Sequence, residues 1–124
     1  MKKIFLDTNF LIDFIRFKPD LKEIDDLVND SYKLVVLDVV MKELKKISES
    51  KTKGSNYAKI ALEFVKSKQI EILETTEEHA DESILALSDE NTIVATDDAE
   101  LREKLKSLGI KTIYLRAKKH LAMS

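Results

Sequence analysis

The chain has 124 residues, of which 44% are hydrophobic, and this is enough for one domain with its own core. The absence of cysteine excludes disulfides and a thiolate zinc site, and two histidines cannot build a metal site alone. Any metal must therefore be held mainly by oxygen, which favours Mg²⁺ or Mn²⁺, while the net charge of −2 does not indicate a strongly basic surface for nucleic acid.

Short apolar runs alternate along the chain with segments whose apolar residues recur every three or four positions, which predicts strands and amphipathic helices. In chain order we expect a strand at 4–6, helices at 10–16 and 20–28, a strand at 34–37, helices at 39–47 and 57–65, a strand at 70–73, a helix at 79–87, a strand at 92–95, a helix at 101–108 and a strand at 110–115. The strongest helical stripe consists of Tyr57, Ile60, Ala61, Phe64 and Val65.

Short apolar strands that alternate with helices are typical of a parallel sheet covered by helices on both faces. We therefore expect a three-layer α/β/α fold with a central parallel sheet of about five strands. Residues 1–116 would form this single domain, and residues 117–124 a basic, less ordered tail. No signal peptide and no apolar run of about 20 residues is visible, so we expect a cytoplasmic protein without a membrane segment.

Four acidic residues follow the first four predicted strands: Asp7, Glu43, Asp81 and Asp98. Ligands of open parallel sheets bind beyond the carboxyl ends of the strands, so we expect the four side chains to converge there. Two unit charges about 5 Å apart repel by roughly 3 kcal/mol at an effective dielectric of about 20, and a divalent cation removes that penalty. Such an ion can activate water and stabilise charge on a phosphoryl oxygen, which suits phosphodiester hydrolysis.

Three of these acids also have an ordinary structural interpretation. Asp7 could serve only as a helix cap, because Asp is a preferred N-cap residue. Glu43 could be a solvated helix residue among lysines. Glu78 and Glu82 compete with Asp81 for the third position.

The fourth acid has a neighbouring rival. With Asp97 as the N-cap, Glu100 falls at the third helical position and completes a capping box. We therefore expect Asp97 to cap the helix and Asp98 to bind metal. For the first helix Thr8 or Asn9 is the expected cap. Asp38 is interpreted as a plain N-cap and Asp13 as a surface group.

Four segments resemble, in order, the motifs of the PIN-domain nuclease family: residues 5–10 (FLDTNF), 37–44 (LDVVMKEL), 80–85 (ADESIL) and 93–98 (IVATDD). The resemblance extends from about Lys3 to Arg116. It is closest to the archaeal and eukaryotic branch that includes nucleases of small-subunit ribosomal RNA processing. It is more distant from the toxin ribonucleases of bacterial and archaeal toxin–antitoxin pairs.

This resemblance implies Mg²⁺- or Mn²⁺-dependent endonucleolytic cleavage of single-stranded RNA, in ribosomal RNA processing or as a toxin. By motif position the catalytic metal ligands are Asp7, Glu43, Asp81 and Asp98. The side chains that orient them are Thr8, Asn9 and Thr96. The chain departs from the family at Asp97, where relatives often carry Asn. The implied partners are the RNA substrate, an antitoxin or ribosome-assembly partner, and a second copy of the chain.

Two basic stretches are candidate RNA contacts. The first, beside the second motif, includes Lys42, Lys45, Lys46, Lys51 and Lys53. The second, in the tail, includes Arg116 and Lys118. Phosphate contacts there would make binding sensitive to salt, whereas the alternative is a solvated face of a lysine-rich protein.

Two other functions fit parts of the pattern. A non-catalytic RNA-binding or assembly module could use the same fold, although all four acids are present. A receiver-type phosphoacceptor domain also carries acids at strand ends, but it needs an acidic pair near the first strand, which the run Asp7-Thr8-Asn9 lacks.

Overall fold

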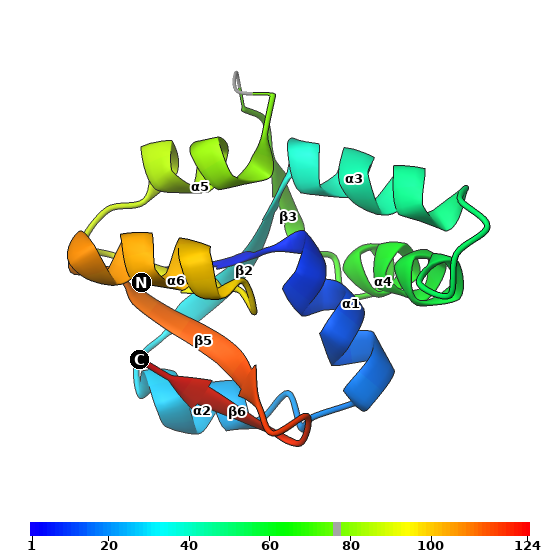
Figure 1. The fold of residues 1–124 in the computed structure, drawn as a ribbon. Helices are drawn as coiled ribbons and strands as arrows, with labels where there is room; N and C mark the ends of the chain where they lie inside the picture. Colours follow the sequence, from blue (N-terminus) through cyan, green and yellow to red (C-terminus); the bar gives the residue numbers. More distant parts are fainter. Residues whose placement is uncertain (76–77) are drawn as a thin grey trace.

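The computed structural model describes residues 1–75 and 78–124 (Figure 1). Its strands in this part of the chain are β1 (Lys2–Leu6), β2 (Tyr32–Leu37), β3 (Glu71–Leu73), β4 (Thr92–Ala95), β5 (Lys111–Arg116) and β6 (His120–Met123). Its helices are α1 (Thr8–Phe17), α2 (Glu23–Val28), α3 (Asp38–Ser48), α4 (Ser55–Ser67), α5 (Ala80–Leu87) and α6 (Ala99–Ser107). Within these residues, no helix has the length and apolar character that crossing a bilayer requires.

One sheet of strand order β3-β2-β1-β4-β5-β6 organises the fold. The pairings from β3 to β5 are all parallel, and β6 pairs antiparallel with β5. The chain builds outward from β1 through β2 to β3, and then resumes on the other side of β1 with β4. This reversal creates a switch point at the carboxyl ends of β1 and β4, which is where ligands of open α/β sheets bind. Leu6 is in register with Ala95, so the residues that follow the two strands emerge at the same level.

Helices cover both faces of the sheet, and the predicted α/β/α architecture is confirmed. In Figure 1, α1, α3 and α4 lie on one side of the sheet, and α5 and α6 on the other. The central strands are buried because both faces are covered: Ile4, Val35, Val36 and Val94 have no exposed surface. The switch point thus lies at the end of a buried apolar sheet.

The C-terminal residues differ from the prediction of a loosely ordered tail. Residues His120–Met123 form β6, so the sheet has six strands rather than about five. The backbones of Thr112 and Ser124 exchange two hydrogen bonds of 3.0 and 2.9 Å beyond the end of this ladder. Leu121 is 6% exposed and packs into the core, which gives the short segment a reason to order. A four-residue strand behind a basic turn was too short to recognise from its apolar pattern.

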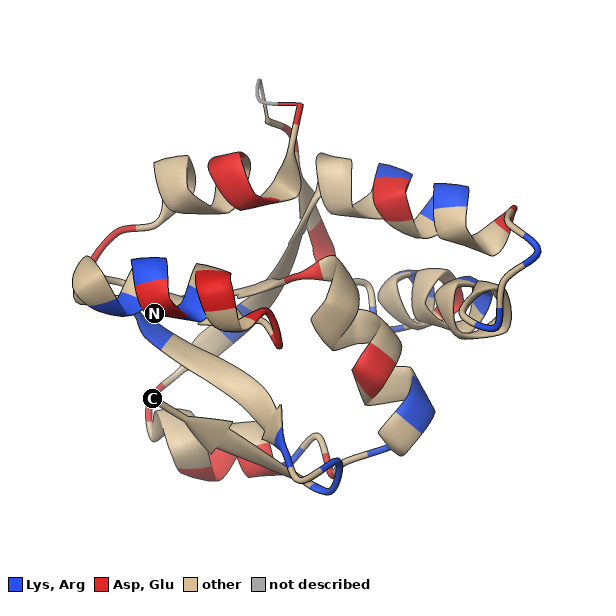
Figure 2. Ribbon diagram, viewed as in Figure 1, with Lys and Arg blue, Asp and Glu red and all other residues tan. Residues whose placement is uncertain are grey.

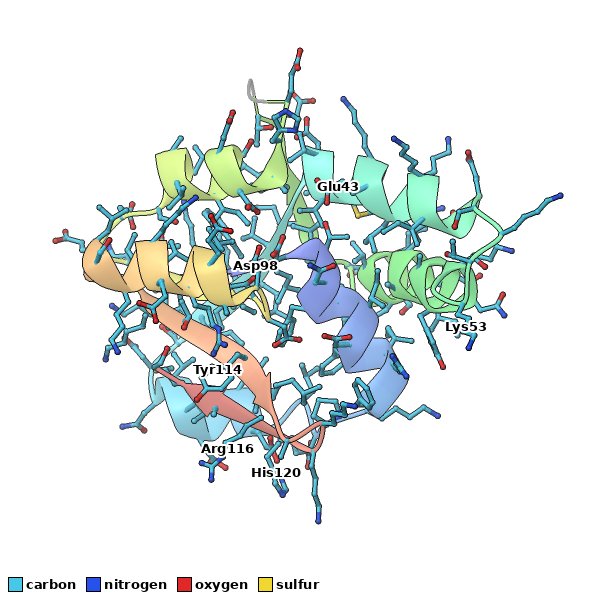
Figure 3. The ribbon with its side chains drawn as sticks, viewed as in Figure 1. Glu43, Lys53, Asp98, Tyr114, Arg116 and His120 are labelled. Atoms are coloured by element: carbon cyan, nitrogen blue, oxygen red, sulfur yellow. The ribbon has the colours of Figure 1, made fainter. Side chains whose placement is uncertain are left out.

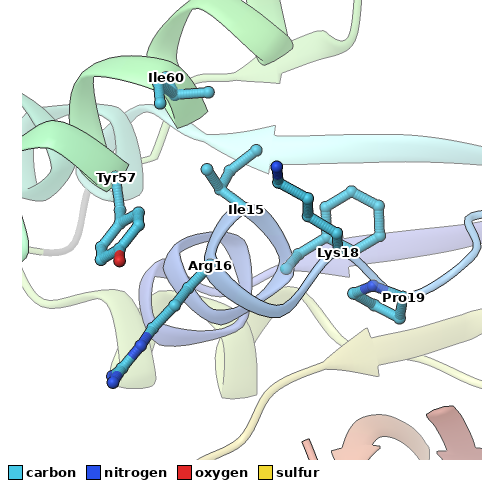
Figure 4. A pocket seen from close by; sticks show the side chains of 7 residues that line it. Ile15, Arg16, Lys18, Pro19, Tyr57 and Ile60 are labelled. Atoms are coloured by element: carbon cyan, nitrogen blue, oxygen red, sulfur yellow. The ribbon is translucent and has the colours of Figure 1, made fainter. Parts of the chain in front are cut away.

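The predicted apolar stripe of α4 is wrong at Ile60, which is 50% exposed. The helix buries Ala58, Ala61 and Val65 instead. Small alanine side chains let α4 approach its neighbours closely, and this rotates Ile60 outward. A groove of about 540 Å³ remains between α1 and α4, with Ile60 and Tyr57 on its wall (Figure 4).

Candidate active site

The four predicted acids come from four separate elements around the switch point. Asp7 directly follows β1, and Asp98 precedes α6 after β4. Glu43 lies in α3, and Asp81 is the second residue of α5. In Figure 3, Glu43 and Asp98 lie on either side of the start of α1, where Asp7 ends β1.

Asp7 is the most buried of these acids, with 4% exposure. Its Oδ1 accepts a hydrogen bond of 2.9 Å from the Thr8 N–H, so Asp7, rather than Thr8 or Asn9, caps α1. Its Oδ2 accepts a hydrogen bond of 2.8 Å from the fully buried Thr96 hydroxyl. The Thr96 Oγ1 in turn accepts from the Asp98 N–H at 3.2 Å. One threonine therefore links the first and fourth motifs.

A second threonine joins the first and second motifs. The Thr8 hydroxyl donates to the Glu43 Oε2 at 2.6 Å, and this bond bridges α1 and α3. Asn9, the other predicted orienting residue, is exposed, and no contact among the described residues ties its side chain to the acids. Thr8 and Thr96 thus take positions that orient carboxylates, whereas no such contact is seen for Asn9 among the described residues.

The electrostatics show that the carboxylates influence one another. Burial raises the pKa of Asp7 to about 6, and the charges of Asp81 and Glu43 add to this effect. Burial also raises the pKa of Asp81, and the charges of Asp98 and Glu43 add to it. Net negative charge therefore accumulates at this rim.

A cleft of about 440 Å³ opens beside these acids. Its lining residues are Glu43, His79, Ala80, Asp81, Glu82, Leu85 and Lys104. Sequence reasoning did not select Lys104, although its charge lowers the pKa of Asp81. The sequence offered one signal for this residue: Lys104 follows Glu100 by four positions, which places the two on one face of a helix, and the side chains pair at 3.6 Å. The cleft thus holds a cation as well as carboxylates.

The donor chemistry of the site fits Mg²⁺ or Mn²⁺, because every converging ligand is a carboxylate and these ions prefer oxygen. Among the described residues, however, no group of three or more acidic or histidine side chains is already placed to hold an ion. Both oxygens of Asp7 and one of Glu43 are engaged by protein donors. The carboxylates are gathered at one rim but do not form a closed coordination sphere.

The prediction that Asp97 caps α6 is wrong. Asp98 caps α6, because its Oδ1 accepts from the Glu100 N–H at 2.9 Å. Asp97 points to β5 instead, where its Oδ1 accepts from the Leu115 N–H at 2.7 Å. Its Oδ2 is buried without a donor. Burial and the carboxyl of Asp13 raise the pKa of Asp97 to about 7, so Asp13 is not the isolated surface group that we expected.

Asp38 also differs from the expectation of a plain N-cap. Leu37 occupies the cap position of α3 and makes no side-chain cap bond. The Asp38 Oδ1 accepts from the N–H and the hydroxyl of Thr75, at 3.2 and 2.9 Å. Asp38 therefore ties the start of α3 to the segment after β3.

The two basic stretches lie in different parts of the molecule (Figure 2). Lys42 and Lys45 line a groove of about 490 Å³ between α3 and α4, and Lys46 is exposed on the same helix. Arg116 and Lys118 lie at the turn between β5 and β6. The structure does not bring the two groups together.

Comparisons with known proteins agree with this arrangement. A family model described as a PIN like domain matches residues 4–118. The chain is 37% identical over 124 residues to Ribonuclease VapC4 of Methanocaldococcus jannaschii, with 97% of this chain and 95% of that protein covered. Among solved structures, the PIN domain endonuclease Utp24 matches with a TM-score of 0.77 and 25% identity, over 96% of this chain and 90% of that one. A domain of a functionally unknown protein from Methanocaldococcus jannaschii DSM 2661 shares the fold, with a TM-score of 0.61 and 21% identity over 94% and 93% of the two chains. The chain belongs to the PIN-like domain family.

Proposed function

We propose that this protein is a metal-dependent endoribonuclease that hydrolyses phosphodiester bonds in single-stranded RNA. The observation that carries the proposal is the net negative charge of the acidic rim at the switch point. There Asp7 is buried beside the charges of Asp81 and Glu43, with its pKa raised to about 6. A fold that maintains such repulsion gains from it when a divalent cation binds. The names of the relatives, a ribonuclease and a PIN domain endonuclease, support a nuclease of the hydrolase class.

In this proposal the four acids hold Mg²⁺ or Mn²⁺: Asp7, Glu43, Asp81 and Asp98. When bound, the metal supplies an activated water and stabilises charge on a phosphoryl oxygen. The Thr8 hydroxyl orients Glu43, and the Thr96 hydroxyl orients Asp7. Lys104 provides positive charge in the same cleft for a phosphate oxygen of the substrate.

A cleavage assay on defined single-stranded RNAs tests this proposal. Wild-type protein should cut with Mg²⁺ or Mn²⁺, stop in chelator, and leave 5′-phosphate and 3′-hydroxyl ends. Asp7→Asn and Asp81→Asn should each reduce the rate by more than about 100-fold, because even groups that only orient metal ligands contribute roughly 10- to 100-fold. Asp26→Asn is the matched control, because Asp26 is exposed and lies on α2, which carries none of the four acids.

The outcomes separate the enzyme from its alternative. Undiminished cutting by Asp7→Asn would refute the site. RNA binding without metal-dependent cleavage would instead identify a non-catalytic RNA-binding or assembly module. In either case the basic residues of α3, Lys42, Lys45 and Lys46, and those of the β5–β6 turn, Arg116 and Lys118, are proposed to contact the RNA backbone.

The biological role has two forms within this proposal, toxin or ribosomal RNA processing nuclease. Growth arrest on expression, relieved by the product of a small adjacent reading frame, would identify a toxin with an antitoxin partner. Trimming of a precursor of ribosomal RNA together with an assembly partner would identify a processing nuclease. The cytoplasmic location and the homodimer stay predictions, and light scattering of the purified chain tests the latter.

A further inference from the structure

The end of α1 and the β5–β6 turn meet over one aromatic ring. The Arg16 guanidinium lies 4.8 Å from the centre of the Phe17 ring, and the Lys118 ammonium lies 5.6 Å from it. The two cations are far apart in the sequence, and they converge on one ring only because the fold brings α1 to the turn. In Figure 2 the basic residues of these two segments lie near one another at the lower edge of the molecule.

Three further cations lie close to these residues in the sequence: Lys18 follows Phe17, and Arg116 and Lys119 lie near Lys118. We call the whole set the distal cluster: Arg16, Phe17, Lys18, Arg116, Lys118 and Lys119. Its five basic side chains are all exposed. Among the described residues, none of them forms an ion pair with an acidic side chain. A concentration of five unpaired cations contrasts with the net charge of −2 of the whole chain, and it is a ready site for a polyanion.

The turn that presents Lys118 is held in an unusual conformation. The Lys119 N–H donates to the Arg116 C=O at 3.1 Å, and Ala117 and Lys118 have φ values of 53° and 57°. Positive φ at both central residues normally calls for Gly or Asn, so the conformation costs about 1–2 kcal/mol per residue. The surrounding structure must stabilise the turn for this conformation to persist.

Part of that stabilisation comes from α2. The Glu23 carboxylate accepts from the Leu121 N–H at 2.6 Å and lies 2.8 Å from the His120 Nδ1. Figure 3 shows Arg116 and His120 at the lower edge of the molecule, where this bracing occurs. Glu23 is therefore engaged by the hairpin, and the cations of the turn remain available to an external anion.

We propose that the distal cluster binds phosphates of the RNA substrate away from the scissile bond. This inference rests on the proposed function and extends it to how the strand is held. The ten residues of α1 separate the cluster from Asp7, a distance of about 15 Å at 1.5 Å per residue. An RNA must therefore extend several nucleotides beyond the cut to reach it. Arg16 and Lys118 bind the backbone, and Phe17 holds both cations in place.

The groove between α1 and α4 continues from the cluster, because Arg16 and Lys18 line it together with Tyr57 (Figure 4). Its remaining lining is apolar. An exposed cationic edge next to an aromatic wall is the combination that single-stranded RNA uses, with phosphates on the basic side chains and bases against the ring. This continuity favours RNA over a compact anion as the occupant.

The test compares labelled uridine homopolymers of about 6 and about 24 nucleotides in chelator, with binding measured over a range of salt concentrations. The double variant Arg16→Gln/Lys118→Gln should bind the longer RNA about 10-fold more weakly. Its plot of log affinity against log salt should be shallower by roughly 1.4, since each phosphate contact to a single strand contributes about 0.7. The matched control is Lys106→Gln/Lys111→Gln, because these two lysines are exposed and lie outside both basic stretches, near the end of α6 and at the start of β5. Phe17→Leu should lose affinity although every charge is kept.

Cleavage kinetics give an independent readout. The double variant should raise KM for the longer RNA, leave kcat unchanged and cut the shorter RNA at the wild-type rate. Circular dichroism melting checks that the variants fold. If Phe17→Leu does not fold, the single variant Lys118→Gln, which changes an exposed residue of the turn, still tests the inference. The inference would be overturned if the double variant kept the wild-type affinity and salt slope. It would also be overturned if the double variant lost binding to poly-glutamate but not to RNA, because that would indicate an acidic protein partner. If wild-type protein binds RNA through the cluster but never cuts, the proposed function fails and this inference stands.

Discussion

Replacing Asp7 by Asn should make the metal-free protein more stable while it destroys the enzyme. Asp7 is 4% exposed, and burial together with the charges of Asp81 and Glu43 raises its pKa from 3.8 to about 6. A raised carboxyl pKa means that the folded state disfavours the ionised form. The difference corresponds to about 3 kcal/mol of destabilisation once the group is ionised in both states.

The sign fixes the pH window of this effect. Below about pH 4 Asp7 is protonated in both states, and the penalty is absent. It grows as the pH rises towards 6 and is complete above about pH 7. The amide nitrogen of Asn cannot accept the hydrogen bond that Thr96 donates to Asp7. The loss of this bond reduces the gain in stability by about 1 kcal/mol. The net gain of about 2 kcal/mol predicts a Tm higher by roughly 6–10 °C at pH 8 for a chain of this size.

Thermal melting in chelator between pH 4 and 8 measures this gain, with Asp26→Asn as the control. Mg²⁺ at 100 times its Kd should add about 2.7 kcal/mol to the free energy of unfolding of the wild type and so raise its Tm, and it should leave the Tm of Asp7→Asn unchanged. A variant less stable than wild type at pH 8 would refute the reasoning, because it would mean that the Asp7 carboxylate stabilises the fold rather than straining it. A Tm difference independent of pH would refute the raised pKa.

Three further predictions concern single side chains. Thr96→Val should keep the shape of its fully buried site but leave an Asp7 oxygen without its donor. It should lower the free energy of unfolding in urea by about 1–3 kcal/mol and move the pH profile of cleavage towards higher pH. An unchanged profile would show that Thr96 does not act on the site. Asp97→Asn should raise the Tm by several degrees at pH 8 and by little near pH 4, because the raised pKa of Asp97 means that its ionisation beside Asp13 destabilises the fold progressively from about pH 4 to about pH 7; an equal change at both pH values would contradict this. Ala117→Asn should stabilise the β5–β6 turn by about 1 kcal/mol, seen as a higher urea midpoint, because Asn tolerates positive φ; a lower midpoint would show that the turn is not strained.

The sequence was sufficient to predict the layers of the fold and the edge of the sheet at which Asp7 and Thr96 lie. Runs such as Ile4 to Leu6 and Thr92 to Ala95 are apolar because both faces of their strands are covered, and their alternation with helices specifies parallel connections. Once the sheet is parallel, residues directly after its strands must share one edge. Asp7 and Thr96 therefore follow in-register residues of β1 and β4. These predictions depend on local pattern and general topology alone.

The predictions that failed depended on contacts between distant segments. Asp97 and Asp98 are equally suitable as N-caps, and the choice falls to Asp98 because the Leu115 N–H of β5 engages Asp97. Ile60 faces solvent because the buried side of α4 is made by alanines. β6 exists because β5 offers it an edge and Glu23 of α2 holds its start. Each outcome was decided by a partner that lies far away in the sequence.

The hydrogen bonds of the acidic rim partly offset the repulsion among its carboxylates. Thr8 and Thr96 each donate to one carboxylate, and Thr96 also accepts from the backbone of Asp98. The Thr96 hydroxyl and the Thr8 backbone N–H favour the ionised form of Asp7 and partly offset its burial, which explains why the pKa of Asp7 stops at about 6. At neutral pH Asp7 is therefore mostly ionised, which is the state that a metal ligand needs. Thr8 and Thr96 thus favour the charged form of Asp7, whereas burial disfavours it, and the proposed cation would remove that penalty.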